Sequence, residues 1–120
     1  MPHARQQLGQ LGEDLAADFC LQQGWRIIGR NLRDKTGEID ILAQDGEVIV
    51  LIEVKAMQEA SLDHHPIHHI TPQKQRKLSY LVQRIASKFG DRPIRVDAVC
   101  VYWSRSGQPT ISHFPNIFGL

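Results

Sequence analysis

The sequence predicts an α/β fold in which one mixed β-sheet lies between helices on its two faces. Three observations indicate this: two segments with apolar residues at helical spacing, several short runs rich in β-branched residues, and the order helix, strand, hairpin, helix, strand, strand. The 120 residues are enough for one hydrophobic core but not for two. We therefore expect residues 1–120 to form a single domain.

The composition is that of an ordinary globular protein. Apolar residues make up 42% of the chain and charged residues 22%, so disorder is not expected. No apolar run approaches the roughly 18 residues of a membrane span, and the N-terminus lacks the apolar core of a signal peptide. These features predict a cytoplasmic protein. A net charge of +1 argues against indiscriminate coating of nucleic acid but leaves room for a local basic surface.

A first helix is expected over residues 5–23, with Gly24 ending it. Its predicted buried stripe consists of Leu8, Leu11, Leu15 and Phe19. Glu13 lies off this stripe, on a flank of small residues that would let another backbone or a ligand come close. The small residues of that flank are Gly9, Ala16 and Cys20. A solvated helix acid is the alternative interpretation of Glu13.

A short strand over residues 25–28 and a polar connection over residues 29–36 are expected next. Positive charge gathers here, on Arg26, Arg30, Arg33 and Lys35. A basic loop beside clustered acids would suit the binding of a phosphate backbone next to a metal site, although charged loops are commonly only solvated.

Residues 37–55 are predicted to form two strands joined by a turn, and they carry more charge than such strands usually do. Asp45-Gly46 between two β-rich runs is a strong hairpin signal, because both central turn positions need positive φ. With that turn, Glu38 lies opposite Glu53. Alternation along each strand then brings four charged side chains to one face: Glu38, Asp40, Glu53 and Lys55. The other face receives Ile39, Ile41, Val50, Ile52 and Val54.

Asp40 and Glu53 are diagonal neighbours in this register, with β-carbons roughly 7 Å apart or somewhat less. Two carboxylates at that separation can converge on one Mg²⁺, with oxygen ligands at about 2.0 to 2.1 Å. Lys55, on the same face, is placed to hold a phosphate oxygen or a water beside the metal. The alternative is a salt-bridged sheet face. The apolar run over residues 48–52 instead favours a buried central strand, in which charges need partners or a function.

Four histidines follow within a short loop: His64, His65, His68 and His69. Imidazole suits zinc or nickel, but this spacing matches no closed zinc site and has no cysteine nearby to complete one. We interpret the segment as a polar connection or a loop that touches DNA, and a metal site there as the alternative.

A second helix begins with Thr71 as N-cap and Pro72 in its first turn, and Gly90 ends it. Its buried face is predicted to consist of Leu78, Leu81, Val82, Ile85, Ala86 and Phe89. Its other faces carry only positive charge, on Lys74, Arg76, Lys77, Arg84 and Lys88. A face with no acid to neutralise it predicts a surface that contacts phosphates.

The last two strands are expected over Ile94–Trp103 and Pro109–Phe114. Asp97 is interpreted as a polar residue near a strand start, paired with an arginine. Cys20 and Cys100 lie in apolar segments far apart in the sequence and are interpreted as buried thiols.

Five blocks of residues occur in order: Gly9-x-x-Gly12-Glu13; Arg30-Asn31; Gly37-Glu38-Ile39-Asp40 with Glu53-Val54-Lys55; Ile70-Thr71-Pro72-x-Lys74; and Arg95-Val96-Asp97. Together they resemble the uncharacterised YraN-type proteins, predicted endonucleases related to archaeal Holliday junction resolvases and, more widely, to PD-(D/E)xK nucleases. The similarity runs over most of the chain. An Asp and a Glu-x-Lys alone are a weak signal, whereas five blocks in order are a strong one.

The resemblance implies a restriction-endonuclease-like three-layer α/β/α fold with a central mixed β-sheet. It also implies that Asp40 and Glu53, with the carbonyl of Val54, bind Mg²⁺ or Mn²⁺. Lys55 would orient or activate the attacking water, and Glu13 would join the metal site from the first helix. This chemistry suits the residues, because a bound cation neutralises charge on the scissile phosphate and lowers the pKa of bound water.

The role of Glu38, which also matches a family position, stays open. The residues expected to contact nucleic acid are Arg30, Arg33, Lys74 and Lys77. The chain departs from the family pattern at Ala56-Met57, where a small residue and an arginine are usual. One expected phosphate contact is therefore missing.

The leading interpretation is a Mg²⁺-dependent nuclease that hydrolyses phosphodiester bonds in DNA, including branched, Holliday-junction-like DNA. A homodimer is expected if two strands are cut symmetrically. One alternative is a nucleic-acid-binding module that keeps the fold without cutting. A weaker one is a metal-handling protein that uses the histidines of residues 64–69.

Overall fold

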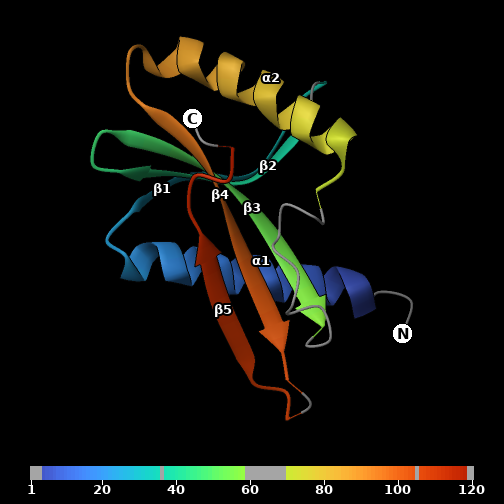
Figure 1. Cartoon of the computed structure of the whole chain (residues 1–120). Coiled ribbons are helices and arrows are strands. Elements are labelled where there is room, and N and C mark those ends of the chain that lie inside the picture. Colours follow the sequence, from blue (N-terminus) through green and yellow to red (C-terminus); the bar gives the residue numbers. More distant parts are fainter. Residues whose placement is uncertain (1–3, 36, 59–69, 105, 119–120) are drawn as a thin grey trace.

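The computed structural model describes residues 4–35, 37–58, 70–104 and 106–118. This part of the chain forms two helices and a five-stranded sheet (Figure 1). The elements are α1 (Ala4–Gln22), β1 (Arg26–Arg33), β2 (Glu38–Asp45), β3 (Val48–Gln58), α2 (Pro72–Phe89), β4 (Ile94–Trp103) and β5 (Pro109–Phe114). The strands lie in sequence order, and all neighbours are antiparallel except β3 and β4. The sheet is therefore mixed, as predicted.

The two helices pack on opposite faces of the sheet, which confirms the three-layer α/β/α architecture (Figure 1). The core on the α1 side includes Ala16, Cys20, Ile41, Val50, Ile52 and Val99. The core on the α2 side includes Leu42, Ile49, Leu51, Leu78, Leu81 and Val96. The central strand β3 is thus covered on both faces, as the apolar run at its start predicts.

Ile39 is an exception to the predicted alternation, since it belongs to the core on the α2 side and not to the α1 side. It lies near the start of β2, where the chain passes close beneath α2. A Cβ atom added to Gly37 would be 3.5 Å from Cδ1 of Leu81. This close approach brings Ile39 within reach of the α2 cluster.

The buried face of α1 differs from the predicted leucine stripe. Leu11 is 52% exposed, whereas Ala16 and Cys20 are fully buried. Small side chains let the helix come close to the sheet: a Cβ atom on Gly12 would lie 3.5 Å from Cβ of Ala56. The packing face of α1 therefore includes the small-residue flank together with Phe19, which packs against the same core.

The first strand is longer than predicted, because β1 runs to Arg33. Pairing with β2 continues as far as Arg33 opposite Glu38, with a register shift between Ile27 and Gly29. Arg30 and Arg33 therefore lie on an edge strand and not in a loop. Ladder pairing with β2 overrides the polar character of these residues.

α2 begins and ends as predicted. Oγ1 of Thr71 accepts a hydrogen bond from the amide of Lys74 (3.1 Å), and Gly90 follows the helix with a positive φ of 69°. Leu78, Leu81 and Ile85 are buried. Neither helix among the described residues is long and apolar enough to cross a membrane.

Asp97 is fully buried on β4 and is held by three partners. Nε of Arg95 donates to it at 3.0 Å, Nε2 of His113 lies at 2.7 Å, and the amide of Asn116 donates at 2.9 Å. The predicted arginine pairing is confirmed, and the histidine ties β5 to β4. Cys20 and Cys100 are buried free thiols, as predicted.

Candidate functional site

The turn of the hairpin lies one residue later than predicted. Asp45 pairs with Val48, so Gly46 and Glu47 are the two central turn residues. Gly46 has a φ of 59°, and only the first central position of such a turn needs glycine. The prediction that Asp45 and Gly46 are the central turn residues is therefore wrong. A single residue with positive φ, Gly46, is enough to close this turn.

The observed register of β2 and β3 ends at the pair Ile41 and Ile52, directly before the two acids. Asp40 and Glu53 are the neighbours of that last pair on their own strands, and they lie close enough for the charge of Glu53 to act on Asp40. The shift amounts to two residues, and a shift of two keeps Ile41, Val50 and Ile52 together on one face, as predicted. Lys74 of α2 contacts Glu53 and its charge also acts on Asp40, so both carboxylates lie toward α2.

The sheet forks at these acids. Pairing between β2 and β3 ends at Ile41 and Ile52, whereas β2 stays paired to β1 and β3 stays paired to β4 beyond that point. In Figure 1 the start of β2 runs toward α2 while β3 continues away from it. Oδ2 of Asp40 fills the gap in the ladder by accepting a hydrogen bond from the amide of Val54 at 2.8 Å.

Glu53 is the most deeply buried acid of the site, with 2% of its side chain exposed. Among the described residues, its Oε1 atom accepts no hydrogen bond of good geometry. Two ammonium groups face this oxygen: Nζ of Lys74 is in ion-pair contact with it, and Nζ of Lys55 lies 3.9 Å away. The charges of these two lysines therefore hold Glu53 in its buried position.

Burial, followed by repulsion from Glu53, raises the pKa of Asp40 to about 7, although the Val54 amide and Lys74 act in the opposite direction. Burial lowers the pKa of Lys74, but its contact with Glu53 and the nearby charge of Asp40 outweigh this and raise the pKa overall. A carboxyl group whose proton is lost near neutrality beside an ammonium group is typical of functional sites.

Glu13 is held by other partners on the α1 side of the molecule. Its Oε1 accepts from Nε of Arg30 at 3.1 Å and from Nδ2 of Asn31 at 2.9 Å. Arg30 also contacts Asp14 at 2.5 Å. Among the described residues, no three His, Cys, Asp or Glu side chains are gathered closely enough to hold one metal ion. The predicted set of three carboxylates is thus not assembled, and Arg30 is engaged by two acids.

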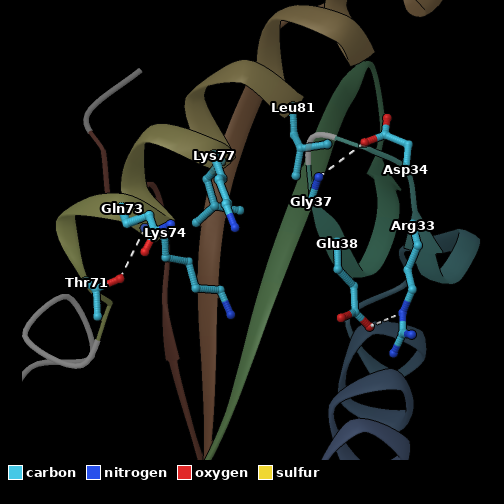
Figure 2. Close-up of a pocket in the computed structure, with 10 residues that line it drawn as sticks. Arg33, Asp34, Gly37, Glu38, Thr71, Gln73, Lys74, Lys77 and Leu81 are labelled. Atoms are coloured by element: carbon cyan, nitrogen blue, oxygen red, sulfur yellow. Dashed lines mark hydrogen bonds and ion pairs between the residues drawn. The ribbon is translucent and has the colours of Figure 1, made fainter.

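A groove of about 600 Å³ opens between α2 and the chain that joins β1 to β2 (Figure 2). Lys74, which contacts Glu53, lines this groove, whereas Asp40 and Glu53 do not. The lining of the groove includes Arg33, Gly37, Glu38, Thr71, Lys74 and Lys77. Glu38 contacts Arg33 at 3.4 Å on one wall, and Lys74 extends from the other wall. Three of the four residues predicted to contact nucleic acid, all but Arg30, therefore line one groove.

The contact of Lys74 with Glu53 is the feature that the sequence did not reveal. The N-cap signal of Thr71 places Lys74 in the first turn of α2, but it does not say which strand that turn meets. The histidines at positions 64, 65, 68 and 69 lie outside the described residues.

Two solved structures overlap with this fold at low similarity. A chain of the EndoMS–dsDNA2 complex matches with a TM-score of 0.43 and 18% identity, over 71% of this chain and 34% of that one. Pyrococcus furiosus SfsA in complex with Ca²⁺ matches with a TM-score of 0.37 and 16% identity, over 92% of this chain and 63% of that one. Likeness at this level carries no inference about ligands.

Sequence relatives are much closer. A protein of Renibacterium salmoninarum is 43% identical over 109 residues, which span 89% of this chain and 92% of the relative. Proteins of Leifsonia xyli subsp. xyli and Streptomyces griseus are each 38% identical to this chain, and the aligned residues span 97% and 95% of those proteins, respectively. All three are named UPF0102 proteins, and the sequence profile of that family matches residues 12–101. The chain belongs to the Uncharacterised protein family UPF0102.

Proposed function

We propose that this protein is a Mg²⁺-dependent nuclease that hydrolyses phosphodiester bonds in DNA, with branched DNA as its preferred substrate. The observation that carries the proposal is the proximity of Asp40 and Glu53 at the fork of the sheet, where two lysines approach Glu53. Two carboxylates this close repel each other unless a cation or a proton neutralises part of their charge.

The residues present fit a hard divalent cation. Oε1 of Glu53 is buried against the ammonium groups of Lys74 and Lys55, so a divalent cation could supply the neutralisation that they now provide. Mg²⁺ is commonly held by one or two carboxylates and keeps several waters, so a third carboxylate is not required. Asp40, Glu53 and the Val54 carbonyl would hold Mg²⁺ or Mn²⁺. When bound, the cation would neutralise charge on the scissile phosphate and lower the pKa of a bound water.

Lys55 would orient the attacking water. Its ammonium lies 3.9 Å from Glu53 and its side chain is 26% exposed, so it faces both the acids and solvent. In the reaction, the water oxygen forms a bond to phosphorus and the bond to one ester oxygen breaks. The ester oxygen takes up a proton, and the water gives one up. An ammonium can donate hydrogen bonds to the water or to a non-bridging oxygen throughout this exchange.

The groove between α2 and the chain that joins β1 to β2 would receive the nucleic-acid strand. Lys77 and Arg33 are exposed along it, and their charges suit phosphates. A homodimer would let two such sites act on two strands, which is the arrangement that a branched substrate needs.

A nucleic-acid-binding module that does not cut is the second candidate. The observation that favours it is the position of Glu13, which is engaged by Arg30 and Asn31 and so does not complete a set of three acids. In that case the carboxylates would serve only to hold Lys74 and Lys55 in place.

A cleavage assay separates the two candidates. The protein is incubated with single-stranded, linear duplex and four-way-junction DNA of matched sequence, in Mg²⁺, in Mn²⁺ and in chelator. We expect cutting that depends on the metal, is fastest on the junction, and falls by about 10³-fold or more in Asp40→Asn and Lys55→Ala.

Glu47→Gln is the matched control, because Glu47 is an exposed acid in the turn of the same hairpin. It should cut at the rate of the unaltered protein. Cutting that survives in both Asp40→Asn and Lys55→Ala would reveal a contaminant and overturn the proposal. Tight binding of DNA without cutting under every metal condition would establish the module.

A further inference from the structure

We propose that the ammonium group of Lys74 stands in for the divalent cation in the metal-free protein, and that cation binding releases Lys74 into the groove, where it binds a phosphate of the nucleic-acid strand. This inference rests on the proposed function and adds a residue of α2 that links metal occupancy to substrate binding.

The contact itself is the first step. Nζ of Lys74 is in ion-pair contact with Oε1 of Glu53, which is the same buried oxygen that accepts no directed hydrogen bond. A cation bound by Glu53 would use this oxygen. The ammonium and the metal therefore compete for one atom.

Charge decides the outcome of that competition. Without metal, Lys74 and Lys55 offset the negative charge of Glu53, and Lys74 also acts on Asp40, so the two neighbouring acids are tolerated. A divalent cation supplies the same neutralisation at closer range. Once the cation is bound, it repels the ammonium group of Lys74, and Glu53 no longer needs that ammonium for neutralisation.

Lys74 is the lysine that can leave. Its side chain is 40% exposed, against 26% for Lys55, and it reaches the acids from the first turn of a helix and not from the strand that carries Glu53. Its four-carbon stem can turn into the groove without any backbone movement. Figure 2 shows this side chain extending from α2 into the space that the groove residues surround.

In the groove, the released ammonium group would contact a phosphate of bound nucleic acid and not another acidic side chain. Its two acids are already engaged, since Glu38 contacts Arg33, while Asp34 contacts Arg84 and accepts from the amide of Gly37. Lys77 lines the same groove. Metal binding would thus raise the positive charge available to a phosphate, and by reciprocity bound nucleic acid would raise the affinity for metal.

Titration calorimetry with Mn²⁺ alone, without nucleic acid, tests the competition. Lys74→Met keeps much of the side-chain volume and removes the charge, so we expect Mn²⁺ to bind at least tenfold more tightly than to the unaltered protein. Lys77→Met, which alters the next turn of the same helix, should bind Mn²⁺ within twofold of the unaltered protein. Equal or weaker Mn²⁺ binding in Lys74→Met would overturn the inference.

A second variant guards against a folding defect in Lys74→Met. Lys74→Gln can still donate a hydrogen bond to Glu53 without a charge, and it should also gain Mn²⁺ affinity. If the unaltered protein binds Mn²⁺ and cuts DNA but neither variant gains affinity, the inference fails and the proposed function stands. If no form binds Mn²⁺ at all, the proposed function fails together with the inference.

Binding of a fluorescent DNA junction tests the second half of the inference. In a Lys55→Ala background, where cutting is expected to be lost, Mn²⁺ should raise the affinity for the junction at least fivefold over chelator. Adding Lys74→Met should abolish most of this increase, whereas adding Lys77→Met should lower affinity by the same factor with and without metal. An increase that persists in full without Lys74 would contradict the proposal.

Discussion

The backbone amide of Val54 donates a hydrogen bond to Oδ2 of Asp40 across the fork of the sheet, at 2.8 Å. This bond holds the carboxyl group in place while burial, and then the neighbouring Glu53, raise its pKa to about 7. The carboxyl group of Asp40 is therefore held in one position, while its charge changes near neutral pH. We expect both the stability of the protein and its affinity for metal to depend on the protonation of Asp40.

In the absence of metal, Asp40 should make folding less favourable as the pH rises. Its pKa of about 7 in the folded protein exceeds the ordinary value of 3.8, so the folded state holds the proton more strongly. This contribution is fully present below pH 4 and is lost as the pH rises through 7. Asp40→Asn cannot ionise and keeps an oxygen for the Val54 amide. It should match the unaltered protein only below pH 4, and its stability advantage should be about 2 to 3 kcal/mol larger at pH 8 than at pH 5.

Urea denaturation in chelator at both pH values measures this difference. Glu47→Gln serves as the control, because it replaces an exposed acid in the turn of the same hairpin. A difference between Asp40→Asn and the unaltered protein that does not vary with pH would show that Asp40 has an ordinary pKa.

Metal binding should displace the proton of Asp40. The affinity for Mn²⁺ is expected to fall by up to about tenfold for each pH unit below 7, because the cation requires the ionised carboxylate. Above pH 8 the affinity should level off. Calorimetry in two buffers of different ionisation enthalpy counts the protons released, and release at pH 8 as large as at pH 6 would contradict the assignment.

The basic residues should separate into two groups in DNA-binding measurements. Lys77→Ala removes an exposed charge of the groove, so it should weaken DNA binding a fewfold and reduce the salt slope by about one. Arg30→Ala breaks contacts with Glu13 and Asp14, so it should lower stability more than it lowers affinity. Fluorescence anisotropy at several salt concentrations, with thermal melts in parallel, distinguishes the two. Equal loss of affinity in both variants would show that Arg30 also faces the nucleic acid.

Gly12 should tolerate one added carbon and no more. A Cβ there would lie 3.5 Å from Ala56 and 3.7 Å from Trp103, which is ordinary contact, so Gly12→Ala should stabilise α1 by about 0.5 to 1 kcal/mol. Gly12→Val should destabilise the protein by about 1 to 3 kcal/mol, because its methyl groups would push the helix off the sheet. Gly9→Ala is the control, since a Cβ at Gly9 has no atom within 4 Å and should show the helix gain alone.

Asp97 should matter for folding and not for the proposed chemistry. Burial raises its pKa, but hydrogen bonds from His113, Asn116 and Arg95 outweigh burial and lower the pKa overall. The stability it contributes is therefore present at neutral pH and is lost as the pH falls below about 4. Asp97→Asn should cost about 2 to 4 kcal/mol at pH 7 in urea denaturation, with Mn²⁺ affinity of the folded protein unchanged. A Mn²⁺ affinity that falls with stability would place Asp97 in the metal site.

The elements that the sequence predicts best are those with both a clear period and clear end signals. α2 has an N-cap at Thr71 and a glycine at position 90, and its predicted bounds are the observed ones. In α1, the leucine period predicts only part of the buried face: Phe19 packs against the core but Leu11 is exposed, and the burial of Ala16 and Cys20 depends on how closely the helix approaches the sheet. Periodicity records hydrophobicity and does not record that distance.

The partners of the candidate site residues could not be predicted from the sequence. The predicted turn was misplaced by one residue, which shifts the register of the hairpin by two. The contacts of Glu13 with Asn31 and of Lys74 with Glu53 join elements that only the folded chain brings together. No local pattern in the sequence encodes such pairs.

The fork of the sheet also exposes a backbone group, which side-chain substitutions do not alter. In a strand, the N–H and C=O of one residue point to the same side, and the N–H of Val54 points toward Asp40. The carbonyl of Val54 therefore faces the same unpaired edge. If pairing between β2 and β3 continued, this carbonyl would accept a hydrogen bond from β2. Replacing the Val54–Lys55 amide by an ester would weaken that carbonyl as an oxygen donor while keeping every side chain. The identity of residue 54 is then secondary, because its backbone makes the contact.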